Sequence, residues 1–205
     1  MGFFPLPPPI LPASILNVSA KENPFASVKI ESLPFRFPVG MSWDTLLKRL
    51  DELRWCASIV GGNGVGKTTL VEQLIPKLEE RGYQPVVIRL NAETSMREKD
   101  RLPEKLRELV APQFIIIDGA EQLSTRHWLP VRGAASKAAG FIVTVHRSSR
   151  LPVALELESN VKLFEALVTE LCGGKLPEDE AHSIFLRNRG NIRECFRELY
   201  DRWNG

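Results

Sequence analysis

The chain has 205 residues, of which 43% are hydrophobic and 25% are charged, and its formal net charge is +2. These proportions are those of ordinary globular proteins and exclude disordered, collagen-like and disulfide-scaffold chains. The length predicts one core domain with a small appendage. Charged residues do not gather in any one part of the chain, so its charge distribution does not indicate a nucleic-acid-binding surface.

The cysteines and the apolar N-terminus indicate the cellular compartment in which the protein is expected. Cys56, Cys172 and Cys195 are widely spaced and form no CxxC pair, which argues against a disulfide framework or a zinc site and favours a reducing, cytoplasmic setting. Residues 1–16 are apolar, but they hold five prolines and no lysine or arginine, so they do not fit a signal peptide. No uninterrupted apolar run reaches the about 18 residues that a membrane span needs.

Residues 1–40 are expected to form a proline-rich leader. They hold eight of the 15 prolines, and proline fixes φ and removes an amide donor, so we expect an extended, partly disordered segment. The composition favours a loose or surface-hugging leader, while a polyproline ligand for a partner protein stays open as the alternative.

Residues 41–159 show alternating strand and helix patterns. Helices are predicted after Ser42 and over 70–78, the second with a kink at Pro76. Short apolar segments, separated by helix-length stretches, predict five strands: 55–60, 86–90, 114–118, 141–146 and, with a weaker pattern, 153–157. This alternation predicts a three-layer α/β/α fold whose five-stranded parallel sheet is buried on both faces.

Residues 160–205 are predicted to form a small lid of three helices. Apolar residues recur at helical spacing after Asn160 and again over 192–203. Gly173 and Gly174 would end the first helix, and a second helix is predicted to begin near Pro177, with acidic residues in its first turn.

Residues 61–68, GGNGVGKT, match the phosphate-loop pattern G-x-x-x-x-G-K-[ST] in full. Glycines let successive backbone amides point at phosphate oxygens, Lys67 brings a cation to the β- and γ-phosphates, and the Thr68 hydroxyl ligates Mg²⁺. Thr69 lies one residue further into the helix N-terminus, where it would meet the α-phosphate. The candidate nucleotide-binding residues are Gly61, Gly62, Asn63, Gly64, Val65, Gly66, Lys67, Thr68 and Thr69.

A candidate metal-binding carboxylate ends the segment FIIID at 114–118. Four apolar residues of a buried strand bring Asp118 to the carboxyl edge of the sheet, where such sheets bind ligands. An apolar strand ending in aspartate is common by itself. Its position about 50 residues after Lys67 favours a role in holding Mg²⁺ through water.

The two motifs GGNGVGKT and FIIID resemble the Walker A and Walker B motifs of P-loop NTPases, in particular the ATPase branch that contains the AAA+ and STAND families. The resemblance spans about residues 42–203 and implies ATP and Mg²⁺ as cofactors. The chain lacks the N-K-x-D motif of Ras-like GTPases and the LSGGQ-type signature of ABC ATPases, so adenine is the expected base.

Two further segments resemble sensor motifs of these ATPases. GFIVTVHRS, residues 140–148, is similar to the fourth strand of STAND proteins, which makes Thr144, His146 and Arg147 candidates for sensing the γ-phosphate. RGNIRE, residues 189–194, resembles the sensor-2 motif, in which a lid arginine reaches that phosphate. Arg193 is that residue, and the alternative is a solvated helix arginine.

The chain departs from the AAA+ pattern after Asp118. In that family the catalytic glutamate usually follows the aspartate directly, whereas here Gly119 follows and Glu121 comes three residues later. This spacing resembles the D-G-x-[DE] form of NACHT-type STAND proteins. Two roles stay open for Glu121: orienting the attacking water, or a surface position in a protein that hydrolyses ATP slowly.

Two other elements follow from the resemblance. Any arginine finger would come from a neighbouring subunit, and Arg126, Arg132 and Arg150 are unranked candidates for it. Residues 23–25 and 34–38 precede the core, where AAA+ proteins often contact adenine, which makes them candidates for that contact.

Together these patterns predict an ATP-binding protein with slow or regulated Mg²⁺-dependent hydrolysis, coupled to a conformational or assembly switch. Its expected partners are ATP and either further copies of the chain or another protein. Two alternatives remain: a non-hydrolysing ATP-binding adaptor, such as a DNA-transaction or secretion helper, and a small-molecule kinase, against which RGNIRE argues.

Overall fold

The computed structural model describes residues 23–147 and 149–204, so the expectations placed on residues 1–22 lie outside it. Two units divide the chain: Phe35–Glu158, which carries the sheet, and a helical unit built from the described parts of Met1–Pro34 and Ser159–Gly205. No helix among the described residues is long and apolar enough to cross a membrane.

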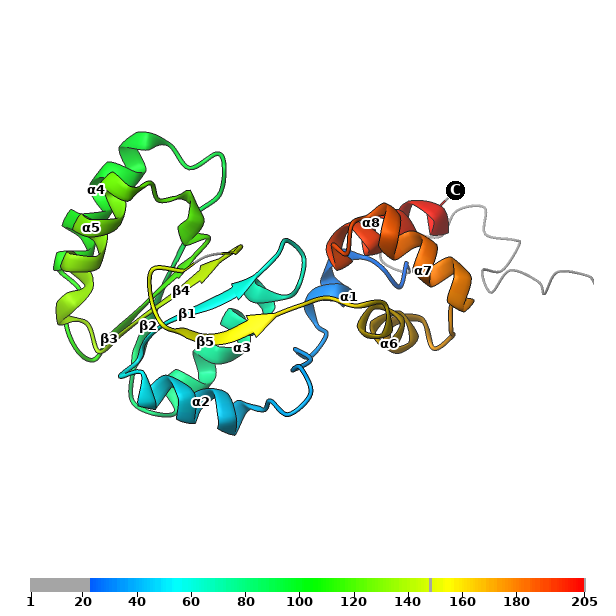
Figure 1. The fold of residues 1–205 in the computed structure, drawn as a ribbon, viewed down its shortest axis with the longest axis horizontal. Helices are drawn as coiled ribbons and strands as arrows, with labels where there is room; N and C mark the ends of the chain where they lie inside the picture. The colour runs from blue at the N-terminus through cyan, green and yellow to red at the C-terminus, as the bar shows by residue number, and fades with distance from the viewer. Residues whose placement is uncertain (1–22, 148, 205) are drawn as a thin grey trace, which may run out of the picture. The chain divides into compact units, whose positions relative to one another are not determined.

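Five parallel strands form the sheet of the first unit, in the order β2-β3-β4-β1-β5 (Figure 1). The strands are β1 (Cys56–Gly61), β2 (Gln84–Arg89), β3 (Gln113–Asp118), β4 (Gly140–Val145) and β5 (Val153–Leu157). All five predicted strands are confirmed, with ends that differ by at most two residues. This order places β4 between β1, which leads into the glycine-rich loop, and β3, which ends at Asp118.

Helices cover both faces of this sheet, which confirms the three-layer fold (Figure 1). Helices α2 (Trp43–Glu52) and α3 (Lys67–Glu79) lie on one face, and α4 (Met96–Arg107) and α5 (Thr125–Ala134) lie on the other. Because side chains alternate along a strand, β3 divides its residues between the two cores. Phe114 and Ile116 pack with α2 and α3, while Ile115 and Ile117 pack with α4 and α5.

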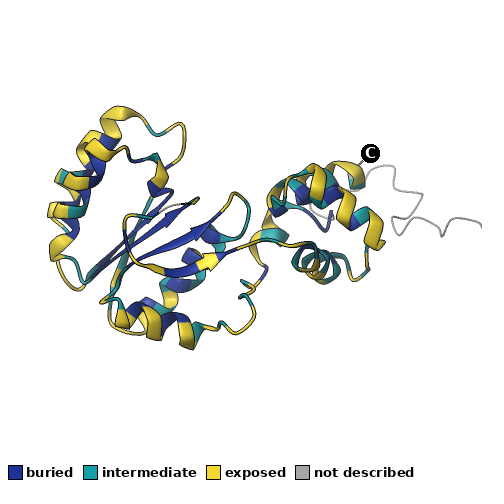
Figure 2. Ribbon diagram, viewed as in Figure 1, coloured by how far each residue is buried: buried dark blue, intermediate teal, exposed yellow. Residues whose placement is uncertain are grey.

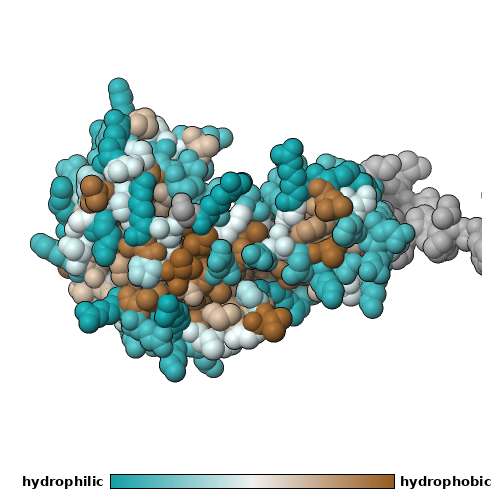
Figure 3. Space-filling view, viewed as in Figure 1, coloured by the Kyte–Doolittle hydropathy of each residue, from teal (hydrophilic) through white to brown (hydrophobic). Residues whose placement is uncertain are grey.

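Burial follows from these two cores. In Figure 2 the central strands are drawn as buried along most of their length, while the helices show exposed residues on their outer faces. On the face drawn in Figure 3, hydrophilic residues cover most of α4 and hydrophobic residues gather near the strands. The near-continuous apolar strands of the sequence thus reflect a sheet covered on both sides.

Local signals explain where several helices begin. Ser42 and Thr45 form a capping box at the start of α2, with Thr45 N donating to Ser42 Oγ at 3.2 Å and Ser42 N donating to Thr45 Oγ1 at 2.6 Å. Helix α3 continues through Pro76 to Glu79. The alternation expected from the sequence is wrong between β4 and β5, where residues 146–152 are too short for a helix and the described ones form none.

The second unit contains α1 (Ser27–Glu31), α6 (Val161–Cys172), α7 (Glu178–Arg187) and α8 (Ile192–Asn204). The three helices predicted for the lid are confirmed. They pack around a core that includes Phe164 and Phe196. The Gly173 residue that follows α6 has φ +68°, the left-handed conformation that glycine adopts at helix ends.

Residues 23–34 depart from the extended leader that the sequence predicted. Phe25 is buried in the core of the helical unit, with its ring centroid 6.1 Å from that of Phe196. Asn23 is also buried; its side chain accepts from Phe25 N at 2.9 Å and donates to the carbonyl of Tyr200 at 3.0 Å. The prolines biased the prediction towards an extended chain, but burial of aromatic surface against α8 outweighs that local preference.

Candidate functional site

The glycine-rich loop joins the end of β1 to the start of α3, as the motif requires. Gly66, the residue before the helix, has φ +94°, a left-handed conformation that favours glycine. A Cβ on Gly61 would lie 2.9 Å from the carbonyl oxygen of Leu157 and 2.7 Å from Val65 Cγ2, closer than Cβ atoms approach. These two glycines are therefore required by backbone geometry and close packing in this loop.

Lys67 begins α3 and turns its side chain back over the loop. Its Nζ donates to the carbonyls of Gly61 at 2.6 Å and of Gly62 at 2.7 Å, and the residue is buried. A buried ammonium at a helix N-terminus creates a positive site, because the unpaired amides and the dipole of the helix add to its charge. Phosphate oxygens are stronger acceptors than these carbonyls, so an anion entering the loop would compete for Nζ.

Asp118 is held at the carboxyl edge of the sheet by hydroxyls from two neighbouring elements. Thr68 Oγ1 donates to Oδ2 at 2.9 Å, and Thr144 Oγ1 donates to Oδ1 at 2.5 Å. Thr144, which is fully buried, also accepts from Gly119 N at 2.9 Å. Since β4 lies between β1 and β3, Thr144 reaches the carboxylate from the neighbouring strand, while Thr68 reaches it from the helix that follows the loop.

The oxygen atoms gathered here fit a magnesium ion. Mg²⁺ prefers hard oxygen ligands and is usually bound by one or two carboxylates together with waters and substrate phosphates. Thr68 and Asp118 supply a hydroxyl and a carboxylate that already lie 2.9 Å apart beside the loop. The described residues contain no cluster of three or more histidine, cysteine or acidic side chains.

Gly119 turns the chain sharply after Asp118. Its φ is +89°, and a Cβ there would collide with the carbonyl oxygen of Leu90. The turn leads into a short 3₁₀ helix, Ala120–Gln122, and so places Glu121 next to the end of β4. Glu121 Oε1 lies 2.8 Å from His146 Nε2, a pairing that the sequence did not predict because the two residues belong to different strand ends.

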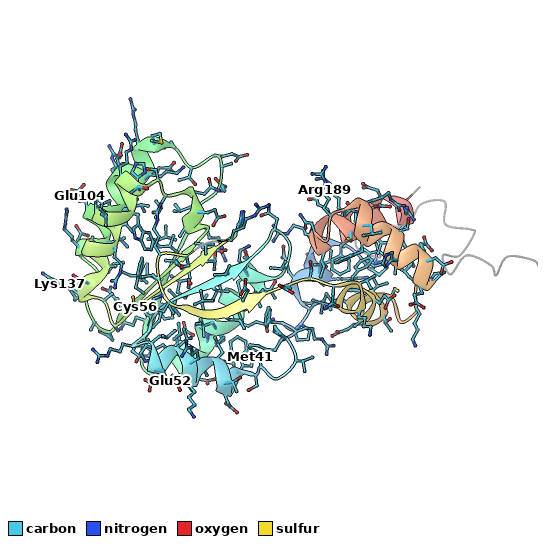
Figure 4. All side chains as sticks on the ribbon, in the orientation of Figure 1. Met41, Glu52, Cys56, Glu104, Lys137 and Arg189 are labelled. Atoms are coloured by element: carbon cyan, nitrogen blue, oxygen red, sulfur yellow. The ribbon has the colours of Figure 1, made fainter. Side chains whose placement is uncertain are left out.

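The remaining sensor candidates are exposed. Arg147 follows β4 and is exposed, as is Arg193 at the start of α8 in the helical unit. Arg189, which opens the RGNIRE segment, has φ +52° and projects away from the lid helices (Figure 4). The sensor roles of Arg147 and Arg193 stay predictions.

Each arginine-finger candidate already contacts a side chain of its own unit. Arg126 lies 3.9 Å from a carboxylate oxygen of Asp100. The guanidinium of Arg132 lies 5.8 Å from the ring centroid of Phe141, and that of Arg150 lies 5.4 Å from the ring of Trp128. These contacts do not rank the three candidates.

An aromatic segment borders the glycine-rich loop. A Cβ on Gly66 would lie 3.4 Å from the ring of Phe35. Phe35 N donates to Gln73 Oε1 of α3 at 3.0 Å, and the Phe35 ring stacks edge-on against Phe37, with centroids 4.9 Å apart. Of the two segments expected near adenine, 34–38 therefore has a residue beside the loop, whereas Phe25 lies in the core of the helical unit. The contact between Gln73 and the Phe35 backbone was not predicted from the sequence.

Solved structures with a similar fold include proteins of DNA replication. A replication initiator DnaA bound to AMPPCP and single-stranded DNA matches with a TM-score of 0.56 and 16% identity, over 83% of this chain and 62% of that chain. A RuvB variant of Thermotoga maritima matches with a TM-score of 0.52 and 18% identity, over 76% of this chain and 58% of that chain. A DNA replication initiation factor matches with a TM-score of 0.53 and 17% identity, over 83% and 62%.

This chain thus spans about six tenths of the length of each of these structures. At the level of sequence, no family model and no curated protein matches it. At identities of 16–18% the likeness establishes the fold alone.

Proposed function

We propose that this chain, which has the fold of the AAA+ class of P-loop NTPases, binds ATP with Mg²⁺ and hydrolyses it slowly or under control. The observation that carries the proposal is the Asp118 carboxylate, held by Thr68 from the loop helix and by Thr144 from β4. A surface carboxylate would not need two hydroxyl donors from two other elements. A carboxylate that must face a metal beside a phosphate loop does need a fixed orientation.

The residues around this carboxylate have separate tasks in the proposed site. Lys67 and the amides at the start of α3 would bind the β- and γ-phosphates, and Thr68 with Asp118 would hold Mg²⁺. Phe35 would supply an apolar surface for the adenine ring. Mg²⁺ supplies charge neutralisation for the transferred phosphoryl group, while the chain positions that group and the attacking water.

The output of hydrolysis is proposed to be a change in conformation or assembly. The helical unit carries Arg193 on a helix start that resembles sensor 2, so the presence of the γ-phosphate would be read by the lid. A non-hydrolysing adaptor is the second candidate, favoured by Gly119 in the place where AAA+ ATPases usually have the catalytic glutamate. A role beside DNA belongs to this second candidate.

The test is binding of a fluorescent ATP analogue to wild type and to Lys67→Ala. Loss of charge-assisted hydrogen bonds worth about 1.5–3 kcal/mol should weaken binding by about ten- to a hundredfold or abolish it. Lys77→Ala is the matched control, because Lys77 lies on the same helix and its ammonium sits 5.0 Å from the Trp43 ring. Binding by Lys67→Ala that equals wild type would refute the phosphate-loop assignment.

Turnover separates the two candidate functions. Steady-state ATP hydrolysis with Mg²⁺ is measured over a range of protein concentrations, beside size-exclusion chromatography with and without ATP. Turnover per subunit that rises with concentration supports an assembling ATPase with a shared site. Tight ATP binding without turnover supports the adaptor.

A further inference from the structure

Asp118, the last residue of β3, and Glu121, three residues later, each meet a residue from the end of β4. Asp118 accepts from Thr144, and Glu121 lies 2.8 Å from His146. Thr144 lies within β4, and His146 is the first residue after it. One strand end thus provides one partner for each carboxylate.

Glu121 needs such a partner to act at a defined place. It lies on the 3₁₀ turn after Gly119 rather than on the strand. Its side chain has several rotatable bonds, so its carboxylate takes many positions unless another group holds it. Its side chain is 23% exposed and that of His146 is 35% exposed, so the pair is neither fully buried nor freely solvated. Oε1 faces the imidazole, and Oε2 has no partner among the described residues.

We propose that His146 is the positioning residue for Glu121, holding its carboxylate so that the free oxygen orients the water that attacks the γ-phosphate. This inference rests on the proposed function and adds a residue to it. In the step concerned, the water oxygen bonds to the γ-phosphorus while the bond to the β–γ bridging oxygen breaks. ADP leaves, and both water protons end on the phosphate as H₂PO₄⁻, so the charge of ATP⁴⁻ is conserved.

The spacing after Asp118 explains why a second residue is needed. The backbone of the strand would orient the side chain of a glutamate that follows it directly. The orientation of a glutamate three residues after Asp118 depends instead on the turn that carries it. His146 replaces that missing constraint from the neighbouring strand. A purely structural role for His146 is the alternative, and it predicts that loss of the imidazole acts independently of Glu121.

The experiment measures turnover and nucleotide affinity of the full chain for wild type, His146→Ala, His146→Gln, Glu121→Gln and the double variant Glu121→Gln/His146→Ala. We expect His146→Ala to lower kcat by about ten- to a hundredfold, the size expected for a misplaced group, with affinity for the ATP analogue unchanged. His146→Gln should recover part of the rate, because the glutamine amide can donate to a carboxylate. The double variant should be no slower than Glu121→Gln alone.

The control is His182→Ala, an exposed histidine of α7 whose loss should leave turnover unchanged. Wild-type kcat in His146→Ala, or equal rate losses on the wild-type and Glu121→Gln backgrounds, overturns the inference and leaves the proposed function standing. Wild type that binds ATP without turnover overturns both this inference and hydrolysis, while wild type that fails to bind ATP overturns the proposed function as a whole.

Discussion

Replacing Thr144 with valine tests whether its hydroxyl organises the site. Valine keeps the volume of the side chain in this fully buried position, so no cavity is made. It removes the donor to Asp118 Oδ1 and the acceptor of Gly119 N, both of which the structure shows as buried hydrogen bonds. The effect on stability is therefore electrostatic rather than steric.

The magnitude follows from those two bonds. A buried amide left without a partner costs about 1–3 kcal/mol, and a hydrogen bond to a charged group is worth about 1.5–3 kcal/mol. The two losses share one hydroxyl and are not additive, so we expect the free energy of unfolding to fall by about 3 kcal/mol. With a urea m value of about 1.5 kcal/mol/M, this shifts the unfolding midpoint by about 2 M.

The assay is urea unfolding followed by circular dichroism, with Mg²⁺-dependent turnover measured in parallel. Thr144→Ser is the matched control, because it keeps the hydroxyl and loses only a methyl group worth about 1 kcal/mol. Turnover should fall with valine and be largely retained with serine. A valine variant as stable as wild type, or one more stable than the serine variant, would refute the role given to this hydroxyl.

Two further predictions concern the turn after β3 and the helical unit. Gly119→Ala should lower the free energy of unfolding by about 2 kcal/mol or more, since φ is +89° and the new Cβ would meet the Leu90 carbonyl. Thermal melts measure this loss. The control is Gly133→Ala on the exposed face of α5, where open space surrounds the new Cβ, and this variant should be neutral or stabilising. Partial burial acts to raise the pKa of Glu198, but hydrogen bonds from Arg187 and Asn188 outweigh it, so the pKa lies below its ordinary value. A lowered pKa stabilises the fold above the unfolded-state pKa, and this stability is lost as pH falls through the folded-state pKa. Glu198→Gln should therefore flatten the decline of the melting midpoint between about pH 6 and pH 3, whereas parallel declines in variant and wild type would contradict the effect.

The strands and the glycine-rich loop were predictable because their signals are local. Each strand is a short apolar run covered on both faces, so its burial can be seen in the residues themselves. The loop motif specifies four residue types within eight consecutive positions, 61–68, which run from the end of β1 into the start of α3. Phosphate-binding chemistry depends on those neighbours in sequence rather than on distant ones.

Local signals misled where longer-range packing decides. Prolines near residues 23–34 predicted an extended leader, yet Phe25 and Leu33 are buried in the helical unit. Proline restricts only its own φ and the residue before it, whereas burial of aromatic surface depends on a partner about 170 residues away, such as Phe196. The pattern of residues within 23–34 therefore does not predict that Phe25 packs against Phe196.

Short stretches of sequence were enough to predict the candidate groups: a glycine-rich loop, an aspartate at a strand end, and a glutamate displaced by a glycine. Which side chains contact these groups depends on how the strands are arranged in the fold. The order β2-β3-β4-β1-β5 inserts β4 between the loop strand and the aspartate strand, and so brings Thr144 to Asp118 and His146 to Glu121. Strand order is set by the packing of whole helices against the sheet, which no short stretch of sequence encodes.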